Sequence, residues 1–86
     1  MLFEFDAVKS QANKQKHGID FTDAQQLWDD ADRLIIPVRN VDEPRFMILS
    51  KLNEKIWAAI YTMRDENIRI ISARRARKEE VDLYES

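Results

Sequence analysis

The sequence has no cysteine and only one histidine, His17. Without cysteine, the chain cannot form disulfides, thiolate metal sites or a cysteine nucleophile. A single histidine also leaves little scope for a zinc site of the His-rich kind. We therefore expect neither a metal ion nor another cofactor. Any reaction must use lysine, arginine, tyrosine, serine, threonine, carboxylate groups or His17.

Glycine, proline and long apolar runs are also scarce. Gly18 is the only glycine and the two prolines are Pro37 and Pro44, so no stretch has the composition of a flexible linker. No apolar run approaches the roughly 20 residues that cross a bilayer, and the first residues lack the basic start and apolar stretch of a signal peptide. A chain of 86 residues can bury one modest core. The sequence predicts a single domain over residues 1–86, a cytoplasmic location and no membrane partner.

The first third of the chain has the apolar spacing of helices, whereas the rest is rich in β-branched residues. Asp6 suits the N-cap and Gly18 the C-terminal cap of a first helix. Thr22 and Gln25 fit a capping box for a second helix. The expected elements are an extended piece around Phe3 and Phe5, helices over 7–16 and 22–28, strands over 34–38, 45–52, 55–63 and 67–73, and a helix over 76–85.

This order predicts an α+β fold in which N-terminal helices pack on a four-stranded antiparallel sheet that is followed by a C-terminal helix. Short polar turns at 52–55 and 64–67 favour antiparallel neighbours. Runs such as 56–60 are apolar on both strand faces. We therefore expect the sheet to be covered on both sides, by the first helices on one face and by the last helix or a partner on the other. Trp28 and Trp57 are expected in the core.

Charge is unevenly distributed along the chain. The net charge is only −2, yet residues 64–78 carry six lysines and arginines against two acids, and residues 79–86 carry four acids and no base. A concentrated basic block is the electrostatic pattern of a protein that binds a polyanion. The low net charge therefore does not argue against a nucleic-acid partner.

The first candidate site is the run 13–18, which places Lys16 and His17 at the end of the first helix. Histidine is the residue type that most often transfers protons near neutral pH, so His17 suits a general base or acid. The same residues also favour a plain helix end, because basic side chains interact with the helix dipole and its last carbonyls and Gly18 is an ordinary cap. Both interpretations remain open at this stage.

The second candidate site is the run 68–78 together with the preceding strand. Alternation places Ile68, Ile70, Ser72 and Arg74 on one face, and Arg69, Ile71 and Ala73 on the other. Thr62 and Arg64 share a face of the neighbouring strand. If the faces coincide, Thr62, Arg64, Ser72 and Arg74 form a polar cluster whose guanidinium groups can bind phosphate in bidentate fashion.

The basic residues after that strand allow two interpretations. Arg75, Arg77 and Lys78 either attract RNA or pair with the carboxylates of the last helix, Glu79, Glu80 and Asp82. Arg45 opens a strand and Tyr84 lies on the last helix. The hydroxyl of Tyr84 could reach the same surface.

Together these motifs resemble the BrnT family of bacterial toxins. The shared pattern is Phe-x-Phe-Asp at the start, Lys9, Asn13, Lys16-His17-Gly18, Phe21, Ala24, Arg45, Ile68-Arg69-Ile70-Ile71-Ser72-Ala73-Arg74, Ala76, Glu79 and Tyr84. The resemblance covers essentially the whole chain. Two departures are Met63, where a polar or charged residue is expected, and Leu49-Ser50-Lys51 in place of Ile-Gly-Lys.

The resemblance implies a RelE-like fold and a ribonuclease toxin of a type II toxin–antitoxin system that arrests translation. It also implies neutralisation by a cognate ribbon-helix-helix antitoxin of the BrnA kind. In such systems the toxin reaches operator DNA only through the antitoxin. The RNA substrate is either free or bound to the ribosome.

RNA can be cut without a metal when its own 2′-hydroxyl attacks the adjacent phosphate, which needs a base, a charge stabiliser and a proton donor. We assign proton transfer to Lys16 or His17, the phosphate to Arg64 and Arg74, and orientation or acid help to Tyr84. The expected RNA-binding residues are Arg45, Thr62, Arg69, Ser72, Arg75, Arg77 and Lys78. The alternative is a module that binds RNA or protein within a complex and catalyses nothing.

Overall fold

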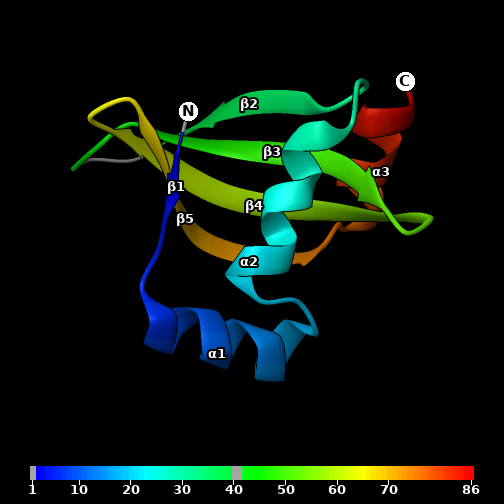
Figure 1. Cartoon of the computed structure of the whole chain (residues 1–86). Helices are drawn as coiled ribbons and strands as arrows, with labels where there is room; N and C mark the ends of the chain where they lie inside the picture. Colours follow the sequence, from blue (N-terminus) through cyan, green and yellow to red (C-terminus); the bar gives the residue numbers. More distant parts are fainter. Residues whose placement is uncertain (1, 40–41) are drawn as a thin grey trace.

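A computed structural model describes residues 2–39 and 42–86. Across these residues a five-stranded mixed sheet has helical segments on both faces (Figure 1). The elements are β1 (Phe3–Glu4), α1 (Ala7–His17), α2 (Phe21–Ala24), the 3₁₀ turn η1 (Gln25–Asp29), β2 (Leu34–Val38), β3 (Arg45–Leu52), β4 (Lys55–Arg64), β5 (Asn67–Arg75) and α3 (Lys78–Glu85). The predicted α+β class is confirmed, and the predicted strands from residue 34 onward differ from the observed ones by two residues at most.

Helix α1 begins and ends where the sequence predicts. The Asp6 carboxylate accepts hydrogen bonds from the backbone N–H groups of Val8 and Lys9, and these bonds lower its pKa. At the other end Gly18 has φ of +81° and its N–H donates to the carbonyl of Lys14. A residue with a side chain is strained in this left-handed conformation, so the glycine ends the helix.

The second helix begins earlier than predicted. Its N-cap is Asp20, whose carboxylate accepts a hydrogen bond from the N–H of Asp23 at 2.8 Å. The predicted capping box of Thr22 and Gln25 is wrong, because the Asp20 carboxylate already caps the first turn. From Gln25 onward the chain tightens into the 3₁₀ turn η1.

The sheet contains one more strand than predicted. Strands β2 to β5 form the expected antiparallel meander, but β1 adds to the edge of β5 in parallel, with Phe3 opposite Ile68 and Glu4 opposite Arg69. The prediction of a four-stranded, purely antiparallel sheet is therefore wrong. The alternation around Phe3 indicated an extended piece, but no local pattern identifies a strand partner more than 60 residues away in the sequence.

Two-residue turns join the three longest strands. Asn53 and Glu54 have φ of +53° and +67°, and Asp65 and Glu66 have φ of +51° and +68°. Two successive positive φ angles match the twist of antiparallel neighbours in tight hairpins. The second hairpin brings the end of β4 next to the start of β5.

A bulge in β5 decides which side chains face which way. Ile60 pairs with Ser72 but its neighbour Tyr61 pairs with Ile70, so Ile71 is an extra residue in β5. The bulge shifts the alternation by one position. The prediction that Ile68 and Ile70 share a face with Ser72 and Arg74 is therefore wrong.

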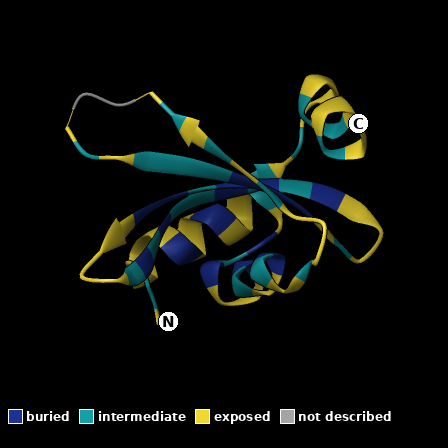
Figure 2. Ribbon diagram, turned by 90° about the horizontal axis from the view of Figure 1, so that it is seen from above, coloured by how far each residue is buried: buried dark blue, intermediate teal, exposed yellow. Residues whose placement is uncertain are grey.

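The two faces of the sheet have different partners (Figure 2). Helices α1 and α2 and turn η1 cover one face, which we call the helix face, where Phe21 and Leu27 pack on buried residues of the strands. Trp28 and Trp57 pack against this core, as predicted. Helix α3 lies on the opposite face, which we call the open face, and contacts β3. The expectation that the last helix contributes to the second cover is confirmed.

Buried polar groups fix α1 and η1 to the sheet. The amide of Asn13 donates to the carbonyls of Ile19 and Ala73, at 2.7 and 2.9 Å, which holds α1 beside β5. The hydroxyl of Ser50, fully buried, donates to the carbonyl of Leu27 at 2.5 Å. The serine at position 50, where the family resemblance led us to expect glycine, therefore contributes a hydrogen bond to η1. Within residues 2–39 and 42–86, no helix is long and apolar enough to cross a membrane.

Candidate nucleic-acid interface

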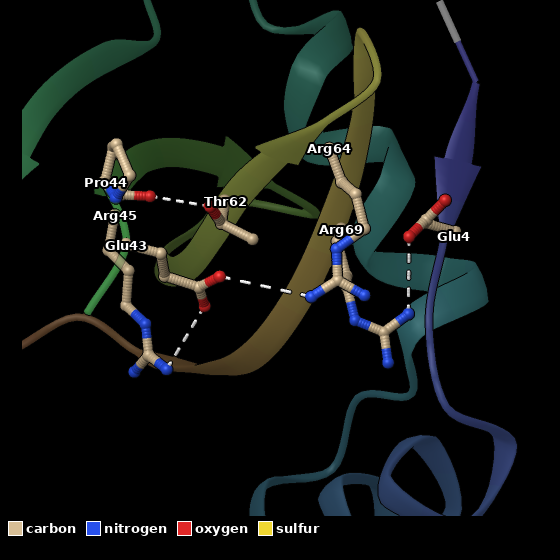
Figure 3. Close-up of polar contacts among 7 residues, drawn as sticks. All are labelled: Glu4, Glu43, Pro44, Arg45, Thr62, Arg64 and Arg69. Carbon is tan, nitrogen blue, oxygen red and sulfur yellow. Dashed lines mark hydrogen bonds and ion pairs between the residues drawn. The ribbon is translucent and has the colours of Figure 1, made fainter.

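Three arginines gather on the open face, at the end away from α3. We call Arg45, Arg64 and Arg69 the arginine cluster (Figure 3). Arg64 ends β4, Arg69 lies near the start of β5, and Arg45 opens β3. Thr62 of β4 pairs with Arg69 of β5, and Thr62 is almost fully buried. The three side chains thus come from three adjacent strands of one sheet. The hydrogen-bonded sheet holds their backbones in fixed positions.

The segment before β3 is fixed to β4 by a hydrogen bond. The hydroxyl of Thr62 donates to the carbonyl of Pro44 at 2.6 Å, and Thr62 is only 2% exposed. Proline also fixes its own φ and restricts the backbone of the preceding residue, Glu43. The hydrogen bond therefore holds the residues that flank Pro44, namely Glu43 and Arg45, close to Arg64.

Two carboxylates lie within the cluster and make long ion pairs. A carboxylate oxygen of Glu43 lies 3.5 Å from Arg45 and the other lies 4.0 Å from Arg64. Glu4, on the edge strand β1, lies 3.4 Å from Arg69. Pairs at these distances are weak compared with close bidentate ones, so an incoming phosphate can compete for the guanidinium groups.

The guanidinium groups keep donors for a ligand. The side chains of Arg45, Arg64 and Arg69 are 36, 52 and 30% exposed, respectively. A guanidinium has five N–H donors, and each of the ion pairs with Glu43 and Glu4 uses one nitrogen. The Nε atom of Arg45 is buried, so the donors that a ligand can reach are the terminal nitrogens of the guanidinium groups. Several donors that face one surface suit the bidentate recognition of phosphate.

The amino-acid sequence matches a model of a known protein family. The model of the ribonuclease toxin BrnT, of type II toxin–antitoxin systems, matches residues 5–80. The chain belongs to the BrnT toxin family. The predicted family is thereby confirmed, and the match includes the whole arginine cluster. A comparison with curated proteins yields no match.

Arg74 of this BrnT family member shares the open face with the cluster but lies at its other end. Arg74 pairs with Ala58 and Arg64 with Asn67, so the two positions are six residues apart along β4, roughly 20 Å of strand. Arg74 donates two hydrogen bonds to Glu80 of α3, at 2.7 and 2.9 Å. These bonds and the charge of Arg74 lower the pKa of Glu80 to about 2. The structure thus uses Arg74 to attach α3 to the sheet.

Tyr84 makes a second attachment of α3. Its hydroxyl donates to the carboxylate of Asp30 at 2.5 Å, which raises the pKa of Tyr84 to about 12. Burial works to raise the pKa of Asp30, but the hydrogen bonds from Tyr84 and from the N–H groups of Lys51 and Asp32 outweigh it and lower that pKa. Tyr84 is therefore directed at η1 and β3 and not at the arginine cluster.

Lys16 and His17 lie on the other side of the molecule. Helix α1 packs on the helix face, and its residue Asn13 bonds to Ala73 near the end of β5. Gly18 lines the same hollow as Trp57, which pairs with Arg75 at that end of the sheet. The arginine cluster is on the open face at the start of β5. The structure therefore does not bring Lys16 and His17 together with Arg64.

The remaining predicted RNA-binding residues are spread between these ends. Ser72, partly buried, lies opposite Ile60 on the open face, between the cluster and Arg74. Arg75 stacks over the ring of Trp57 at 5.7 Å. Arg77 is the N-cap residue of α3, and its N–H donates to the carboxylate of Glu80 at 2.8 Å. Lys78 pairs with Asp82 at 3.5 Å, as the alternative interpretation predicted. None of these three basic residues lies at the arginine cluster.

Sequence reasoning missed the two acids of the site, Glu43 and Glu4. Glu43 stands two residues before Arg45, but its approach to Arg64 depends on how β3 pairs with β4. Glu4 meets Arg69 only because β1 adds to β5. The spacing Glu43-Pro44-Arg45 was a local signal of a fixed acid beside a base, and no local signal connected Glu4 with Arg69.

Proposed function

We propose that this protein is a metal-independent endoribonuclease toxin that holds the scissile phosphate of RNA at the arginine cluster. The observation that carries the proposal is the contrast in pairing on one sheet face. Arg45, Arg64 and Arg69 make long ion pairs at 3.4 to 4.0 Å, whereas Arg74 is bound to Glu80 at 2.7 Å. The cluster thus has the donors to bind a polyanion, and the family assignment to ribonuclease toxins supports RNA as that polyanion.

The chemistry we propose is attack by the 2′-hydroxyl of RNA on the adjacent phosphate. The attack places extra negative charge on the phosphate oxygens, and preorganised guanidinium groups stabilise such charge where it develops. The three arginines stand on adjacent strands, so the sheet holds their backbones in place. Cleavage should therefore yield a 2′,3′-cyclic phosphate and a 5′-hydroxyl end.

The biological role we propose follows the family: inhibition of translation by cleavage of RNA, with neutralisation by a cognate antitoxin of the ribbon-helix-helix kind. A RelE-like relationship of the fold is part of this proposal. We propose that an acidic segment of the antitoxin covers the arginine cluster, because three basic side chains are exposed together there on the open face. Contact with operator DNA would then occur only through the antitoxin.

The experiment that tests this function is cleavage of a defined RNA by the purified protein in the presence of EDTA. We expect fragments with cyclic phosphate ends, and no cleavage of the same RNA with 2′-deoxy sugars. The assay is run with free RNA and again with ribosomes that carry the RNA. Intact RNA in both assays, retarded by the protein in a gel, would instead identify a binding module without catalysis. Cleavage only on addition of a divalent metal would contradict the proposed chemistry.

A further inference from the structure

We infer that Glu43 is the general base that removes the proton from the attacking 2′-hydroxyl. This inference rests on the proposed ribonuclease function and names the proton acceptor for the same site. Arginine side chains stay protonated and only donate, so the three arginines of the cluster cannot accept this proton. The hydroxyl of Thr62 already donates to Pro44 and is almost fully buried. Among the described residues of the cluster, the acceptors are the carboxylates of Glu43 and Glu4.

The position of Glu43 favours it over Glu4. Glu43 lies between two arginines, with one carboxylate oxygen facing Arg45 and the other facing Arg64 (Figure 3). A phosphate held by these two guanidinium groups would lie beside the carboxylate. The attacking 2′-oxygen belongs to the nucleotide that carries this phosphate, so it too lies near Glu43. Within the described part of the chain, Glu4 instead pairs with one arginine of the cluster, Arg69, from the edge strand.

The surroundings of Glu43 are suited to holding a base in place. Its side chain is 34% exposed, so substrate can reach it. Its backbone is restricted by the following proline and fixed to β4 by the hydrogen bond from Thr62 to the Pro44 carbonyl. A general base must lie within hydrogen-bond reach of the proton it removes, and a fixed backbone next to the phosphate site provides this proximity.

The step balances without a metal or a redox partner. The Glu43 carboxylate takes the proton of the 2′-hydroxyl while the 2′-oxygen forms its bond to phosphorus. The bond from phosphorus to the 5′-oxygen breaks, the electron pair leaves with that oxygen, and the oxygen takes a proton from water. The hydroxide so formed takes the proton back from Glu43. The products are a 2′,3′-cyclic phosphate and a 5′-hydroxyl.

The test separates loss of a base from loss of a binding site. Wild-type protein, E43Q and the control E54Q, in the turn between β3 and β4, are compared in single-turnover cleavage of RNA and in affinity for the same RNA with a 2′-deoxy sugar at the cleavage position. We expect E43Q to cleave at least about 100-fold more slowly. Its affinity should be equal or tighter, because the variant removes a negative charge near the phosphate. E54Q should cleave within about threefold of wild type, because the exposed Glu54 lies at the end of the sheet away from the arginine cluster and distant surface charges are screened.

The outcomes distinguish this inference from the proposed function. If wild type cleaves RNA and E43Q cleaves at a similar rate, Glu43 is not the base and the ribonuclease function stands. If E43Q loses affinity in parallel with rate, Glu43 only positions the arginines and the inference is overturned. If wild type cleaves no RNA, with or without ribosomes, the proposed function itself fails. Circular dichroism of each variant verifies that it is folded.

Discussion

The two ends of the open sheet face use arginine in opposite ways. At one end Arg74 makes close bidentate hydrogen bonds to Glu80, whose side chain is 12% exposed. At the other end Arg64 is 52% exposed and lies 4.0 Å from the carboxylate of Glu43. Close, shielded pairs hold structure, whereas long, exposed pairs contribute little stability and yield readily to a ligand. The comparison shows that arginines close together in a sequence can differ in pairing and exposure, and we propose that the exposed ones bind RNA.

The largest effect we expect comes from removing the binding end. The double variant R45A/R64A should lower RNA cleavage by about 100-fold or more, since single donors that stabilise reaction charge are worth that much. The thermal midpoint should change little because the pairs of these arginines are long. Cleavage rate and thermal unfolding are measured on the same preparations.

A matched control for this double variant is R77A/K78A. It removes the same amount of positive charge from exposed positions at the start of α3. We expect cleavage to remain within about threefold of wild type at moderate salt, where distant surface charges are screened. Equal losses in both double variants would mean that general charge, and not the arginine cluster, determines activity.

The next largest effect concerns the end of the open face where Arg74 pairs with Glu80. Because Arg74 lowers the pKa of Glu80 from its ordinary 4.5 to about 2, ionised Glu80 stabilises the fold above pH 4.5, and this contribution is lost as the pH falls toward 2. E80Q should lower the free energy of unfolding by about 1 to 3 kcal/mol at pH 7. Denaturant unfolding at several pH values, with E79Q as the control, measures both the loss and its pH dependence.

The RNA cleavage activity of E80Q further tests the difference between the two ends of the open face. At 25 °C and pH 7 the folded variant should cleave RNA at close to the wild-type rate, since α3 is attached far from the cluster. The stability difference between wild type and E80Q should shrink as the pH falls below 4.5. A difference that stays constant down to pH 2 would show that the pair with Arg74 does not stabilise the fold through the charge of Glu80.

The smallest effect we expect is that of H17A. His17 lies at the end of α1 on the helix face, and the sequence-based assignment of proton transfer to this residue predicts a loss of about 10²-fold to 10⁴-fold in cleavage. The position of the arginine cluster on the open face leads us to expect a rate within about threefold of wild type. Single-turnover cleavage by H17A, and by a Lys16→Ala variant beside it, decides between the two.

Local sequence patterns predicted the helices and strands better than the contacts between them. The strands from residue 34 onward were predictable because polar two-residue turns such as Asn53-Glu54 separate β-branched runs. The strand β1 was not, because its pairing with β5 depends on a contact between distant segments. The bulge at Ile71 reversed the expected facing of Ile68 and Ile70, since strict alternation has no place for an extra residue.

The candidate site was visible in the sequence as a basic block but not as a geometry. Arg64 and Arg69 stood out by charge and strand position. Their separation from Arg74 depends on the length of the β4–β5 hairpin. The pairing of Arg74 with Glu80 depends on where α3 packs on the open face. The role we infer for Glu43 depends on β3 meeting β4. These are tertiary facts that local patterns do not contain.

The most direct test of the central claim compares the RNA affinities of R64Q and R74Q, two variants that each lose one positive charge from the same sheet face. The ligand is RNA with 2′-deoxy sugars, which cannot be cleaved, and binding is measured over a range of salt concentrations. We predict that R64Q binds more weakly and that its slope of log affinity against log salt falls by about 0.7, one phosphate contact on a single strand. R74Q should keep the wild-type affinity and slope while folded. A weakened R74Q beside an unchanged R64Q would contradict the account.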